Sequence, residues 1–114
     1  MHEVSIMRNL LAIALDEWAR AGTDRIAVLR VTAGDLSGIV PEALRFAFDV
    51  LRSEHPATAG ARLEIERVPA SCRCRGCGMR FEPADVVFQC PGCEATDAEI
   101  LRGRELELTR MEIN

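Results

Sequence analysis

Five cysteines lie within 22 residues in the second half of the chain. Four of them form two C-x2-C pairs, Cys74/Cys77 and Cys90/Cys93, separated by 12 residues. This spacing is typical of a zinc ribbon, in which four thiolates hold one tetrahedral ion. Four thiolates leave no open position for water or substrate, so we expect a structural Zn(II) and not a catalytic one.

Other interpretations of the cluster stay open. The same four thiolates suit iron, and the pairs also fit redox dithiols or disulfides, although the sequence shows no secretory leader. The fifth cysteine, Cys72, can replace Cys74 as a ligand or be a spare thiol, and the C-x2-C spacing favours the spare thiol. Glu94 follows the second pair where glycine would turn more easily, as Gly78 does after the first.

The sequence Met1-His2-Glu3 is a second candidate metal site. A free amine at Met1, the imidazole of His2 and deprotonated backbone amides supply a nearly planar nitrogen donor set. Cu(II) and Ni(II) favour this geometry, and Zn(II) much less. Glu3 can orient the imidazole or add a carboxylate. Any chain that begins with Met-His can bind some metal, so from these residues alone an ordinary chain start without a metal function stays open and is favoured.

Apolar periodicity predicts the elements that must position these residues. We expect a helix over 4–21, a buried strand over 25–33, a helix from Pro41 that ends before Pro56, a half-exposed strand over 61–68, a hairpin turning at Arg102-Gly103, and a bulge near Thr109-Arg110.

This order predicts an α+β fold, with a small mixed β-sheet flanked by two α-helices and an inserted four-cysteine zinc-ribbon module. The helical crossover between the two central strands favours a parallel pair. We expect an α/β domain over 1–69 plus 98–114, which contains the candidate N-terminal metal site, and a zinc-binding module over 70–97, which projects from the sheet.

Composition narrows the class of function. The formal net charge of −4 argues against non-specific binding to nucleic acid or to an anionic membrane, and no apolar run reaches transmembrane length. No catalytic serine, phosphate-loop or zinc-protease motif occurs. We therefore expect a cytoplasmic protein that is not an enzyme. The main alternatives are a zinc-ribbon adaptor for nucleic acid or a protein, and a redox dithiol enzyme.

The chain resembles the HypA/HybF family of hydrogenase nickel-incorporation proteins. The resemblance rests on Met1-His2-Glu3 before an amphipathic helix, on the segments 31–37, 44–48 and 63–66, and on the two cysteine pairs in order. It spans the chain from Met1 to Asn114.

The resemblance implies a nickel metallochaperone that delivers Ni(II) to the [NiFe]-hydrogenase large subunit precursor, together with a maturation GTPase. It implies nickel at Met1, His2 and Glu3 through the amine, the imidazole and backbone amides. It also implies structural zinc at Cys74, Cys77, Cys90 and Cys93. A homodimer is a further expectation.

Overall fold

The computed structural model describes residues 2–22, 24–83 and 88–113. Its elements are α1 (His2–Ala21), β1 (Ile26–Gly34), α2 (Pro41–Leu51), the 3-10 helix η1 (Arg52–Glu54), β2 (Arg62–Val68), β3 (Ser71–Cys74), β4 (Arg80–Phe81), β5 (Ala98–Arg102) and β6 (Leu106–Ile113).

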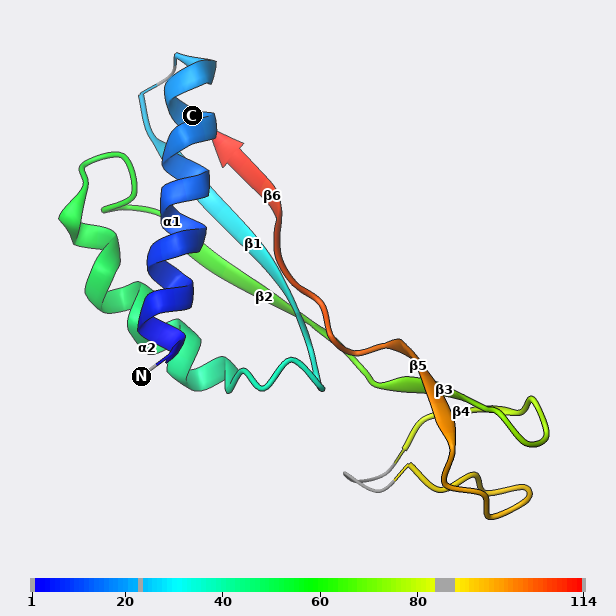
Figure 1. Ribbon diagram of the computed structural model, residues 1–114. Helices are drawn as coiled ribbons and strands as arrows, with labels where there is room; N and C mark the ends of the chain where they lie inside the picture. The colour runs from blue at the N-terminus through cyan, green and yellow to red at the C-terminus, as the bar shows by residue number, and fades with distance from the viewer. Residues whose placement is uncertain (1, 23, 84–87, 114) are drawn as a thin grey trace.

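The first sheet has the strand order β2-β1-β6 (Figure 1). β1 pairs in parallel with β2 and antiparallel with β6, so the sheet is mixed. The crossover from β1 to β2 runs through α2, which begins with Pro41 at its first turn. A proline fits there because its fixed φ suits a helix and its missing N–H would have no acceptor. The predicted parallel pair and the start of the second helix are confirmed.

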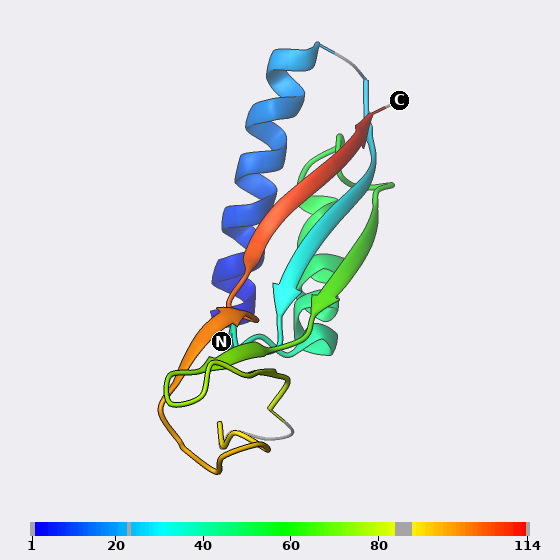
Figure 2. The ribbon, with the colours of Figure 1, turned by 90° about the vertical axis from the view of Figure 1, so that its right-hand side faces the viewer.

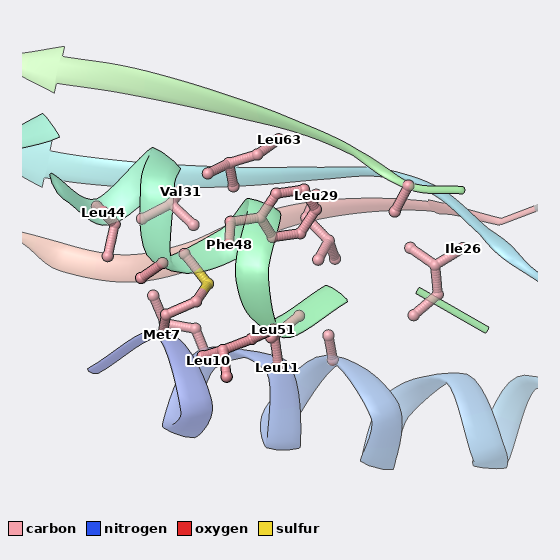
Figure 3. Packing of buried hydrophobic residues seen from close by; sticks show 13 residues of the cluster. Met7, Leu10, Leu11, Ile26, Leu29, Val31, Leu44, Phe48, Leu51 and Leu63 are labelled. Atoms are coloured by element: carbon pink, nitrogen blue, oxygen red, sulfur yellow. The ribbon is translucent and has the colours of Figure 1, made fainter. Parts of the chain in front are cut away.

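The main core lies between the two helices and this sheet. Met7, Leu10 and Leu11 of α1 face Phe48 and Leu51 of α2, and side chains from β1 and β2 close the cluster (Figure 3). Each fully buried side chain of this size contributes about 1.5–3 kcal/mol through removal from water. The apolar stripe of α1 therefore fixes the helix on the sheet, with its first residues held close to α2.

Strand β6 carries the predicted bulge. Arg30 pairs with Arg110 and Val31 with Leu108, so Thr109 is an extra residue opposite the β1 backbone. Side chains alternate between the two faces of a sheet, so one extra residue moves every side chain beyond it to the opposite face. The bulge explains why the apolar positions shift from Leu108 to Met111.

The second sheet has the order β4-β3-β5 and contains the cysteine segments. The predicted hairpin at Arg102-Gly103 is wrong, because β5 pairs with β3 whereas β6 pairs with β1. The chain crosses at Gly103 from one sheet to the other. The side chains of β5 decide this partner, since Ile100 lies opposite Cys72 and packs on the small core of the second sheet.

The structure confirms an α+β fold with two helices, a small mixed sheet and a four-cysteine part inserted between β2 and β6. The second sheet extends along the chain from Ser71, the first residue of β3, to Arg102, the last residue of β5, and these two residues pair with each other. The molecule is elongated, with principal extents of 55 × 26 × 16 Å. The start of α1 lies at the end of the α/β part from which the second sheet extends (Figures 1 and 2). Within the described ranges, no helix combines the length and apolar character needed to cross a membrane.

Candidate metal centres

The structure brings the four paired cysteines together. The Sγ atoms of Cys74, Cys77, Cys90 and Cys93 all lie within 4.8 Å of one another. The Sγ atoms of Cys74 and Cys93 lie 3.4 Å apart, and those of Cys77 and Cys90 lie 3.6 Å apart. Each of these two sulfur pairs joins the two C-x2-C motifs, and both distances are far longer than the about 2.05 Å of a disulfide bond. This arrangement favours a metal ion between the motifs.

The first motif is a tight turn that follows β3. The Cys74 N–H donates to the Met79 carbonyl at 2.8 Å, and the Gly78 N–H donates to the Cys74 carbonyl at 2.9 Å. Gly78 has a φ of +79°, in the left-handed region that glycine enters without a steric cost. The Cys77 N–H points at Cys74 Sγ at 3.4 Å. Such an N–H···S contact stabilises a thiolate.

The second motif repeats the same turn. The Cys90 N–H donates to the Ala95 carbonyl and the Glu94 N–H to the Cys90 carbonyl, each at 2.9 Å. Gly92 N–H points at Cys90 Sγ at 3.4 Å. Glu94 takes the place of glycine with a φ of +65°, which costs a non-glycine residue about 1–2 kcal/mol. The expectation that this turn is less favourable than the first is confirmed.

The negative charges that the four thiols would carry as thiolates also favour a bound cation. Hydrogen bonding from the Cys77 N–H, together with neighbouring thiols and against the effect of burial, lowers the pKa of Cys74 to about 7. The Ala95 N–H lowers the pKa of Cys93, but the thiols of Cys74, Cys77 and Cys90 and burial outweigh it and raise that pKa to about 12. The first thiolate therefore opposes ionisation of the next. A divalent soft or borderline ion removes this conflict, and the donor set fits Zn(II).

Cys72 is not a member of this group of sulfurs. It is fully buried in β3 beside Phe81, and burial raises the pKa of its thiol. A neutral buried thiol behaves as a small apolar side chain. The structure thus gives Cys72 a packing role in the second sheet.

Two aromatic rings and one arginine that the nucleic-acid alternative would use have partners in this part of the molecule, whereas Arg73 and Arg80 are exposed. Arg75 forms an ion pair with Asp97 at 3.1 Å between Nε and Oδ1. Phe81 is buried and Phe88 packs against the same small core, so neither ring is presented for stacking on a base. This part of the molecule does not favour nucleic-acid binding.

The second predicted site lies at the start of α1. The His2 side chain is 64% exposed, and its Nε2 lies 3.0 Å from Glu3 Oε2 and 3.4 Å from the Gly38 carbonyl oxygen. The Glu3 side chain is only 15% exposed, so the protein holds its carboxylate against the imidazole. The predicted ligand Met1 lies outside the described residues.

Sequence reasoning missed the contact between His2 and Gly38 and the junction behind it. The Leu36 N–H donates to the Gly103 carbonyl at 2.6 Å, and the Gly34 N–H donates to the Glu105 carbonyl at 2.7 Å. A Cβ atom on Gly34 would lie 2.0 Å from the Gly103 carbonyl oxygen, so only glycine fits. A glycine directly after a buried strand was the available signal for this close approach.

Comparisons with known proteins agree along the whole chain. The family model described as "Hydrogenase/urease nickel incorporation, metallochaperone, hypA" matches residues 1–113. Hydrogenase maturation factor HypA of a Picosynechococcus species is 41% identical, with 99% of each chain covered, and that of Chloroflexus aurantiacus is 42% identical, with 98% of each covered.

Two solved structures share the fold. The solution structure of a HypA protein has a TM-score of 0.73 at 25% identity and covers 100% of this chain and 97% of its own. The solution structure of the Ni metallochaperone HypA from Helicobacter pylori has a TM-score of 0.68 at 23% identity and covers 97% of this chain and 96% of its own.

Proposed function

This chain belongs to the HypA family of hydrogenase and urease nickel-incorporation metallochaperones, and from this premise we propose that it binds Ni(II) at its N-terminus and delivers it to a [NiFe]-hydrogenase large subunit precursor. The family is one of metallochaperones and not of enzymes. Nickel is therefore cargo, and the site must bind the ion and then release it.

The observation that carries the proposal is the exposed imidazole of His2 at the first residue of α1. The first N–H groups of a helix have no acceptor within the helix. The amides of His2 and Glu3 can therefore lose a proton to bind Ni(II) without breaking a helical hydrogen bond. With the Met1 amine and the imidazole, they provide the nitrogen donors that Ni(II) favours.

Glu3 supports this site by holding the ring. Nε2 of His2 contacts the Glu3 carboxylate and the Gly38 carbonyl. With the proton on Nε2, Nδ1 carries the free lone pair, and Nδ1 is the nitrogen that closes a six-membered chelate ring with the residue's own amide. A carboxylate on the second nitrogen fixes the tautomer and raises the basicity of the first.

We propose that the four clustered cysteines hold a resident Zn(II) ion. Cys74, Cys77, Cys90 and Cys93 supply the thiolates, and the ion would supply the positive charge that allows all four to ionise together. The backbone N–H groups of Cys77 and Gly92 point at the sulfurs of Cys74 and Cys90 and stabilise their thiolate forms. The division into an α/β nickel-binding domain (1–69 plus 98–114) and a zinc-binding module (70–97) belongs to this proposal, with β5 (Ala98–Arg102) as the segment of the first that pairs with β3 of the second.

The proposed partners are a maturation GTPase and the hydrogenase large subunit precursor, in the cytoplasm, and the protein can also pair with itself as a homodimer. Membership of a hydrogenase maturation family supports the first two.

Nickel titration of untagged protein tests the proposal. We expect His2→Ala to lower nickel affinity by at least tenfold, because it removes one of four donors. His55→Ala is the matched control, since His55 is the other histidine of the chain and is used elsewhere: its Nδ1 accepts the Ala57 N–H at 3.0 Å. Equal nickel stoichiometry and affinity in wild type and His2→Ala would refute the proposal.

A further inference from the structure

A groove lies between the N-terminal half of α2 and the ends of β1 and β2. Its volume is about 750 Å³, and its lining includes Ile39, Phe46 and Ile65. Phe46 is 66% exposed, more than the exposed aliphatic helix residues Ile13 (52%) and Val50 (53%), and it is the aromatic one of the three. An exposed aromatic ring at the rim of a groove is a typical anchor point for a partner.

The groove adjoins a strand edge that is open over part of its length. β2 is an edge strand, and alternate residues point their backbone groups outward. The outward carbonyls of Ala61 and Leu63 accept hydrogen bonds from Arg52 Nη1 at 3.0 Å and from Arg45 Nη1 at 2.9 Å. These two arginines of the α2–η1 segment cover the first half of the edge.

The second half of the β2 edge has no such cover. The Val68 carbonyl accepts from the Asp35 N–H, which places the backbone of Val68 toward β1. By alternation Ile65 and Arg67 point outward, and within the described ranges no side chain or strand caps their backbone groups. An uncovered edge of this kind is a template for another strand.

The uncompensated charge around the groove is acidic. The lining carries one more carboxylate than guanidinium groups: Arg67 is paired with Asp35 at 3.0 Å, and Arg45, which donates to the Leu63 carbonyl, keeps its positive charge between the carboxylates of α2. Glu42 and Asp49 line the same groove, and neither takes part in an ion pair among the residues that the structure describes. Along α2 these two carboxylates lie one on each side of Phe46.

We propose that this surface binds an extended segment of a partner protein by strand addition to β2 at Ile65 and Arg67. The segment carries the pattern basic-x-aliphatic-x-basic, with the aliphatic side chain on Phe46 and the basic ones toward Glu42 and Asp49. The spacing fits, because seven helical residues span about 10 Å and four strand residues about 13 Å. Backbone pairing gives affinity and the alternate side chains give specificity.

A second copy of this chain fits the surface less well. Paired through its own β2 edge, it would offer the residues Leu63, Ile65 and Arg67 at alternate positions, and so one basic residue instead of two. The groove also adjoins the N-terminal site, since Ile39 lines it and the preceding Gly38 contacts His2. A bound segment would lie beside that site, although binding does not require nickel.

Selection from a phage-displayed library of random eight-residue peptides tests the proposal. The full chain is the target, and Phe46→Ala is used for counter-selection. We expect enriched sequences to carry an aliphatic residue between Lys or Arg at alternate positions. The synthetic winner should bind Phe46→Ala and the double variant Glu42→Lys/Asp49→Lys at least tenfold more weakly than wild type. Val50→Ala, on the same helix with 53% exposure and outside the groove, should bind as wild type does.

Hydrogen exchange provides the structural readout. The bound peptide should slow exchange of the Ile65 and Arg67 amides, and methylation of alternate peptide nitrogens should abolish binding. The proposal is overturned if no Phe46-dependent sequence is enriched, if the enriched sequences are acidic, or if these two amides stay unprotected. It is also overturned if sedimentation shows a dimer of the wild type that Phe46→Ala dissolves, because a second copy then occupies the edge.

Discussion

The cysteine cluster and the N-terminal site differ in how much of each site the fold builds. In the cluster, two turns with matching backbone hydrogen bonds bring four sulfurs within 4.8 Å. At the N-terminus, one imidazole is 64% exposed and rests on one carboxylate and one carbonyl. The first arrangement is prepared in advance and closed, and the second is open.

This difference corresponds to the difference between a resident ion and a transferred one. Release from a closed site requires several ligands and the surrounding fold to move together, whereas release from a chain end disturbs few contacts. The four-cysteine site therefore suits a structural ion that stays bound, and the exposed histidine suits an ion that is transferred to another protein. Variants at each site, and at the junction that connects the two regions, test this contrast.

Cys90→Ser should have the largest effect. The side chain is fully buried, and structural zinc sites contribute about 10–16 kcal/mol of binding free energy in small zinc domains. We expect loss of stoichiometric zinc and of amide protection in β3, β4 and β5, with protection kept in β1, β2 and β6. Metal analysis and hydrogen exchange measure both.

Two variants control the Cys90→Ser result. Cys72→Ala should keep one zinc per chain, because Cys72 lies outside the sulfur group. His2→Ala should leave the free energy of unfolding unchanged within about 0.5 kcal/mol, as for other surface positions. A strong loss of stability in His2→Ala would contradict the contrast between the two sites.

Gly34→Ala should break the junction between the two regions. The new Cβ would meet the Gly103 carbonyl oxygen at 2.0 Å, and both atoms belong to positions that hydrogen bonds hold in place. We expect a loss of about 3 kcal/mol in the free energy of unfolding, the upper end of overpacking costs. Urea unfolding measures it. Gly60→Ala is the matched control, since its Cβ would meet nothing within 4 Å, and a comparable loss there would contradict the argument.

Glu94→Gly should stabilise the zinc-loaded protein by about 1 kcal/mol, because glycine removes the cost of a φ of +65°. This change would make the second turn of the cluster equivalent to the first. The opposite change at the equivalent position of the first turn, Gly78→Ala, should destabilise the zinc-loaded protein by a similar amount. Thermal unfolding in the presence of zinc compares the three proteins, and a destabilised Glu94→Gly would disprove the strain.

Glu105→Gln should have the smallest effect, visible in its pH dependence. N–H groups at Glu105 and Gly103 lower the pKa of Glu105 below 4.5, and the Gly103 N–H donates to Oε1 at 2.7 Å. A carboxylate with a lowered pKa stabilises the fold above pH 4.5, and this contribution is lost as the pH falls through the folded value.

The stability difference between wild type and Glu105→Gln should therefore shrink below pH 4.5. Urea unfolding at pH 6 and pH 3.5 measures it. Glu107→Gln, an exposed change in β6, is the matched control for replacing a carboxylate by an amide. A gap between wild type and Glu105→Gln that widens toward low pH would contradict the assignment.

Local patterns were sufficient for much of the fold. Apolar spacing predicted both helices, the helical crossover predicted the parallel pair, and a one-residue phase change predicted the bulge at Thr109. The partner of Ala98–Arg102 was predicted wrongly, because alternation shows that a segment is a strand but not which strand it joins. That choice depends on which core covers Ile100, and Ile100 packs beside Cys72 in the second sheet.

The sequence by itself determined the ligand types, since cysteine spacing and a histidine at position 2 set the chemistry whatever the fold. Tertiary structure decided that sulfurs of the two motifs converge, that Cys72 packs in a core, and that Gly38 contacts His2. It also decided that Phe46 stays exposed beside an open strand edge. Donor chemistry belongs to single residues, whereas contacts and exposure depend on segments that are distant in the chain.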